Sequence, residues 1–147
     1  MNVPREQIYN ALFGLAQSAF AAGSGFGIMS RQPQLWTNVK PGDFPAFFQW
    51  EVSEKADQVT FGLTRWEAKV KWMVFVQPSQ NYSDVVTARM DPYLDALEKA
   101  LEPDAGGKQT LGGLVANVWV DGTVLKDVGV LSSTAGFMMP LTIITGQ

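Results

Sequence analysis

The stretch from Asp91 to Gly122 reads DPYLDALEKALEPDAGGKQTLGGLVANVWVDG and decides the fold class. Its apolar positions are spaced by four, three and four residues: Met90, Leu94, Leu97 and Leu101. This spacing predicts the buried stripe of a helix. Proline is typical of a first helical turn, so Pro92 makes Asp91 the expected N-cap of this helix. A shorter helical piece, beginning at Ser83, is expected before it. Past the glycines, Val115–Val120 alternates in the manner of a strand.

The rest of the chain supplies a second helix and further strands. Residues 4–22 have an apolar helical face made of Ile8, Leu12, Leu15 and Ala19. We expect strands at about 29–39, 46–54, 63–77 and 136–145, and residues 55–62, which lack periodicity, form a hairpin connection long enough to reach a neighbouring chain. The order predicts one α+β domain over residues 1–147. It has a mostly antiparallel twisted sheet with two main helices packed on one face.

The alternation within the strands assigns side chains to two faces. Ala46, Phe48, Trp50 and Val52 share one face of the second strand, and Phe47 lies on the outer face. In the third strand Trp72 and Val74 point inward, whereas Met73 and Phe75 point outward. Apolar side chains on an outer face fit either a subunit contact or residual core, and the pattern leaves both interpretations open.

Two signals near the end of the chain concern sheet edges. Asp121-Gly122 indicates either a hairpin or a bulge. Pro140 lacks the N–H that a ladder requires, so the last strand is expected near a sheet edge.

Composition excludes several classes of function. The 147 residues include no cysteine and no histidine, which removes disulfides, the usual zinc sites and the common catalytic triads. We therefore expect no enzyme, no cofactor and no metal. The net charge of −3 argues against gripping DNA, since that affinity comes from Lys and Arg. No apolar run is long enough for a membrane span and no signal peptide is recognisable, which favours a protein kept in the cytosol.

An acidic stripe runs beside the buried stripe of the second helix, made of Asp91, Asp95, Glu98 and Glu102. Glu98 and Glu102 lie toward the negative end of the helix dipole, where a carboxylate is mildly unfavourable, so local stability does not account for them. The stripe is either a solvated helix face or a surface past which DNA moves without binding. A metal site is the third reading, although oxygen ligands without a turn-forming loop rarely hold Ca²⁺.

Three parts of the chain together resemble the tail terminator proteins of tailed bacteriophages (tail completion, minor tail protein U-like). They are Arg5-Glu6-Gln7-Ile8-Tyr9, the segment from Trp36 through Pro45-Ala46-Phe47-Phe48-Gln49, and Asp91 to Gly122. The resemblance implies a structural virion protein of the tail and neck, assembled in the host cytoplasm. It forms a hexameric ring that caps the tail tube, ends its polymerisation and docks the head connector.

The resemblance also assigns surfaces. The tail tube protein and the head–tail connector protein would be the partners, and DNA would pass through the lumen without specific binding. The acidic stripe would face the lumen, and the loops at 38–44 and 55–62 would contact neighbouring subunits. The expected subunit contacts are Phe44, Phe47, Phe61 and Phe75. Two alternatives remain: another neck component, and a small-ligand-binding α+β domain whose five Trp and nine Phe line a pocket.

Overall fold

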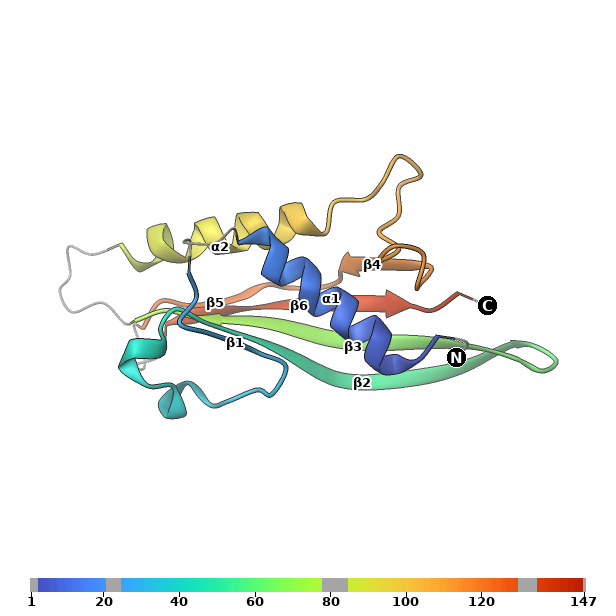
Figure 1. Ribbon diagram of the computed structural model, residues 1–147, viewed down its shortest axis with the longest axis horizontal. Helices are drawn as coiled ribbons and strands as arrows, with labels where there is room; N and C mark the ends of the chain where they lie inside the picture. Colours follow the sequence, from blue (N-terminus) through green and yellow to red (C-terminus); the bar gives the residue numbers. More distant parts are fainter. Residues whose placement is uncertain (1–2, 21–24, 78–84, 130–134, 147) are drawn as a thin grey trace.

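A computed structural model describes residues 3–20, 25–77, 85–129 and 135–146 (Figure 1). The helices are α1 (Arg5–Ala19) and α2 (Val86–Ala100). The strands are β1 (Ile28–Ser30), β2 (Ala46–Thr60), β3 (Leu63–Phe75), β4 (Asn117–Val120), β5 (Leu125–Asp127) and β6 (Gly136–Ile144). Two 3₁₀ turns, Trp36–Asn38 and Pro41–Asp43, lie between β1 and β2.

The strands form one sheet in the order β1-β2-β3-β6-β4, with β5 also paired to β6. Only β1 runs parallel to its neighbour, and the other pairings are antiparallel. The prediction of an α+β domain with a mostly antiparallel sheet is therefore confirmed. The predicted strand at 29–39 is wrong in extent, because β1 ends at Ser30 and the chain continues into a loop with the two 3₁₀ turns.

Both helices lie over one face of the sheet (Figure 1). The buried stripe of α2 is confirmed, since Met90, Leu97 and Leu101 are buried and Leu94 packs against the same core. The N-cap prediction is wrong: α2 starts at Val86, so Pro92 lies inside the helix. The short helical piece predicted from Ser83 begins outside the described residues.

The face assignment of β2 was also wrong. Phe47 pairs in register with Val74, which lies on the helix-covered face, and Phe47 is therefore fully buried beneath α1. Its ring lies 5.8 Å from Trp72 and 6.0 Å from Phe13. The side chains of Ala46, Phe48 and Trp50 consequently point to the opposite face, which we call the open face. Met73 and Phe75 share the open face, as predicted.

The edge of β6 explains both signals near the C-terminus. β4 and β5 pair successively with the same edge of β6, and the four residues Asp121–Val124 lie opposite only Met139 and Pro140. Of the two alternatives for Asp121-Gly122, the chain therefore bulges there and forms no hairpin. The Pro140 carbonyl accepts a hydrogen bond from the Asp121 N–H at 3.0 Å. In an extended strand the nitrogen of a residue faces the same side as its carbonyl, so the missing N–H of Pro140 faces this bulge. The predicted edge position of β6 is thus wrong, since β6 lies between β3 and β4.

Within the described residues, no helix has both the length and the apolar character needed to cross a membrane.

Candidate interaction surfaces

The open face of the sheet is only partly covered. The segment between β1 and β2 lays Val39 onto Ala46, Phe48 and Met73, which form a second small core. Phe44 is half-buried at the border of this core. The loop at 38–44 therefore serves first to cover the sheet, and its exposed residues are Asn38 and Lys40 to Gly42.

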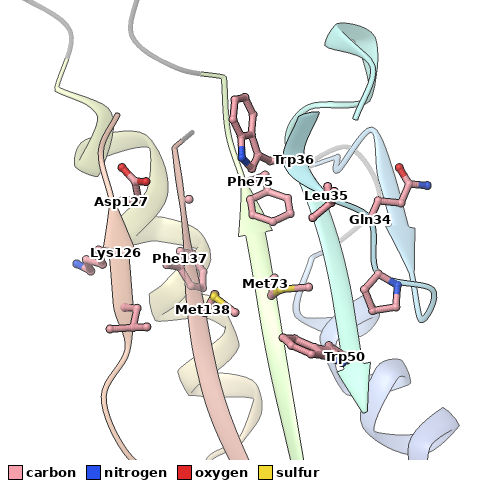
Figure 2. Close-up of a pocket in the computed structure, with 13 residues that line it drawn as sticks. Gln34, Leu35, Trp36, Trp50, Met73, Phe75, Lys126, Asp127, Phe137 and Met138 are labelled. Carbon is pink, nitrogen blue, oxygen red and sulfur yellow. The ribbon is translucent and has the colours of Figure 1, made fainter. Parts of the chain in front are cut away.

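Beside this covered region lies an apolar groove of about 600 Å³ (Figure 2). Loop residues 33–36 form one wall and β5 forms the other, and β2, β3 and β6 supply the floor. The residues that line it are mostly apolar: Pro33, Leu35, Trp36, Trp50, Met73, Phe75, Leu125, Phe137 and Met138. The remaining lining residues are Gln34, Lys126, Asp127 and Gly136.

Three groove side chains are unusually exposed for their size. Leu35 retains 69 % of its surface, Leu125 59 % and Trp50 39 %. The ammonium of Lys126 is held by the Asp91 carboxylate at 2.8 Å, so the groove contains little that would bind a charged ligand. The groove is therefore suited to an apolar group.

At the other end of the sheet, β2 and β3 continue past the last residues of β6 as a two-stranded arm (Figure 1). The sequence predicted a loose connection at 55–62, whereas β2 extends to Thr60 and only Phe61-Gly62 turns the chain. Gly62 has a φ of 78°, a left-handed conformation that suits glycine. We call residues 58–64 the arm tip; they carry no charged side chain.

The arm tip is apolar and exposed. Phe61 is fully accessible at 104 %, and Val59 and Leu63 remain 42 % and 43 % accessible. A large aromatic ring held in water at the end of a rigid hairpin is an uncommon feature of a monomer, because burial of apolar surface is favourable.

The four phenylalanines that the sequence suggested as subunit contacts therefore have different environments. Phe61 is fully exposed at the arm tip, and Phe75 is partly exposed in the groove floor. Phe44 is half-buried, and Phe47 is wrong as a contact because its side chain is buried beneath α1. Sequence reasoning missed Leu35 and Leu125 as groove walls, because each lies in a short segment whose few apolar residues show no helical or strand period.

The acidic stripe lies on α2, on the side of the sheet opposite the groove. Asp95, Glu98 and Glu102 are exposed. Asp91 is half-buried and forms the ion pair with Lys126, so it contributes less net charge to the stripe than the other three. In the described part of the chain, no three acidic residues come together in a way that could hold a metal ion.

A network of ion pairs fastens α1 and β1 to β2. The Arg31 guanidinium donates hydrogen bonds to Glu6 at 3.0 Å and to Glu51, and the bond from Arg31 lowers the pKa of Glu6. The Tyr9 hydroxyl donates to Glu54 at 3.0 Å. Burial, and then this bond to Glu54, raises the pKa of Tyr9 above its usual range. Because these carboxylates are already paired, the network is structural.

No family model matches this sequence, and no curated protein is significantly similar to it.

Proposed function

We propose that this chain is a structural subunit that assembles into a ring, and that the ring is the tail terminator of a tailed bacteriophage. In this role a hexamer caps the tail tube, stops its polymerisation and joins it to the head connector, with no bond-making chemistry. The sequence resemblance motivates the identity of the assembly, and the distribution of exposed apolar surface supports a ring-forming subunit.

One observation carries the proposal: the two exposed apolar surfaces lie at opposite ends of one sheet. The arm projects at one end of the sheet and β5 lies toward the other (Figure 1). Phe61 is exposed at the arm tip, and the groove opens beside β5 (Figure 2). A subunit with different contact surfaces at its two ends associates head to tail. Such contacts form closed rings when the rotation between subunits closes.

The acidic stripe is assigned to the lumen of the ring. Asp95 and Glu98 of α2, and Glu102 just past its end, are exposed to solvent, and their charge repels phosphate, so DNA would move past without binding. In a phage carrying Glu98→Lys and Glu102→Lys together, we expect slower DNA ejection from assembled particles. The lumen assignment is wrong if those particles eject DNA at the normal rate.

Negative-stain microscopy of the purified chain, alone and mixed with the tail tube protein, tests the function. Rings alone, or caps on shortened tubes, are the expected result. A monomer that leaves tube length unchanged would contradict the proposal. Co-purification with portal instead of tube protein would favour another neck component.

The groove supports a second candidate function, a small-ligand-binding domain. Its volume of about 600 Å³ and its aromatic lining lie in the range of ligand sites, which is roughly 300–1,000 Å³. Titration with an apolar fluorescent dye tests this alternative. Saturable binding by a monomer that forms no rings would favour it over the terminator.

A further inference from the structure

We propose that the arm tip of one copy of this chain occupies the apolar groove of the next copy. The inference rests on the proposed ring and specifies the contact that builds it. Phe61 is the anchor, Val59 and Leu63 flank it, and the receiving surface lies between Leu35 and Leu125.

The two surfaces match in chemistry. The arm tip has no charged residue from Gln58 to Thr64, so its insertion would not remove an ion from water. The groove is mainly apolar, and Lys126 at its rim is already paired with Asp91. The Asp127 carboxylate, which also lines the groove, accepts a hydrogen bond from the Gly129 N–H at 2.8 Å. Burying Phe61 against Trp50 and Met138 removes apolar surface from water on both sides.

The tip cannot fill the groove of its own chain. Trp50 lies in the groove and Phe61 at the tip, and both are carried by the same strand and the turn that ends it. At about 3.3 Å per residue the strand holds them roughly 35 Å apart. The ladder from Lys55–Glu67 to Thr60–Leu63 keeps the arm extended, so only a second molecule can supply the tip.

The size of the contact explains why a ring is needed. Burying one Phe removes about 150–250 Å², whereas a stable pair of proteins buries about 800 Å² per partner. A single tip-in-groove contact is therefore weak. In a closed ring each copy uses both surfaces, and the last contact forms within the assembly at high effective concentration. We expect few open dimers and a cooperative transition to a closed ring.

Disulfide trapping tests the contact, because the chain has no cysteine of its own. The test variant is Leu63→Cys combined with Leu125→Cys, oxidised with copper phenanthroline, so that the anchor Phe61 stays in place. Leu35→Cys in place of Leu125→Cys probes the opposite groove wall. The matched control is Leu63→Cys with Val85→Cys, since Val85 is 62 % exposed but lies outside both surfaces. The four single-cysteine variants show how much linkage arises by random collision.

The expected result is a ladder of linked species on a non-reducing gel that stops at the ring size, with peptides joining 63 to 125. All sites substituted are exposed, so unchanged urea midpoints should show that the variants fold. The contact is overturned if both groove pairs link no more than the Val85 control. The contact is also overturned if no ladder forms and an apolar dye binds wild type and the Phe61→Ser variant equally and saturably. In that case a small ligand is the occupant of the groove.

The outcome can be separated from that of the proposed function. Rings on tube ends without a 63–125 link would retain the terminator and reject the contact. A closed ladder from a chain that ignores tubes would support the contact and reject the terminator.

Discussion

Replacing Phe47 and Phe61 separately by alanine tests the central correction to the sequence interpretation. Both were expected as subunit contacts, yet Phe47 is 0 % exposed and Phe61 is 104 % exposed. Moving a phenylalanine side chain out of the core costs about 1.5–3 kcal/mol. A residual cavity of roughly 80 Å³ adds about 2 kcal/mol at 24 cal/mol per Å³. We therefore expect Phe47→Ala to lower the free energy of unfolding by about 4 kcal/mol.

The aromatic neighbours of Phe47 support a value in this range. Its ring lies 5.8–6.0 Å from those of Trp72, Phe13 and Phe26, within the range where aromatic pairs add to burial. Phe61→Ala removes no contact within the monomer, so its effect should stay within about 0.5 kcal/mol.

Urea unfolding followed by tryptophan fluorescence measures both variants. With an m-value of about 2 kcal/mol/M, Phe47→Ala should lower the midpoint by about 2 M and Phe61→Ala should leave it unchanged. The reasoning is refuted if Phe47→Ala changes the midpoint no more than Phe61→Ala, because Phe47 would then not be part of the core.

Three further predictions concern stability. Gln49→Ala should lower the free energy of unfolding in urea by about 2–4 kcal/mol. The buried Gln49 amide accepts a hydrogen bond from Trp72 Nε1 and donates one to the Tyr9 carbonyl, both at 3.0 Å, so its loss leaves the indole N–H without an acceptor. A cost below about 0.5 kcal/mol would contradict this. Hydrogen bonds from Thr142 and Lys69 lower the pKa of Asp121, so its stabilising effect is present above the ordinary value of 3.8 and is lost as pH falls through the folded-state pKa. The Asp121→Asn variant should therefore lose less stability than wild type as the pH falls from about 5 to about 2. Equal losses for the two proteins, measured by thermal melting at each pH, would disprove this. Gly136→Ala should destabilise the fold by about 1–3 kcal/mol, since the added Cβ would overlap the Val74 carbonyl. Gly14→Ala in α1, where an added Cβ meets nothing, should stabilise the fold by about 0.5–1 kcal/mol. Thermal melts in which the two substitutions change stability with the same sign would contradict this pair of predictions.

The arm shows why part of the fold could not be predicted from the sequence. Strand prediction uses alternation, which arises when one face is buried. Residues 55–56 and 58–62 of the arm are exposed on both faces, so their sequence has no period, and they were expected to be a connection between strands. The N-cap at Asp91 failed for a related reason. Proline is also tolerated inside a helix when packing holds it, and Met90 and Leu97 anchor α2 on either side of Pro92.

The sequence by itself determined the helical stripes, the two sets of side chains that share faces in β2 and β3, and the lack of histidine and cysteine. These are local properties, set by the 3.6-residue and two-residue periods and by composition. Only the tertiary structure decided which face of β2 receives the helices. Phe47 and Phe48 are equally apolar, and the pairing of Phe47 with Val74 makes the choice. The groove also depends on the tertiary structure, because Leu35, Trp50 and Leu125 are far apart in the sequence. They come together only when β2 and β5 pair into one sheet and the loop before β2 lies across the open face of that sheet.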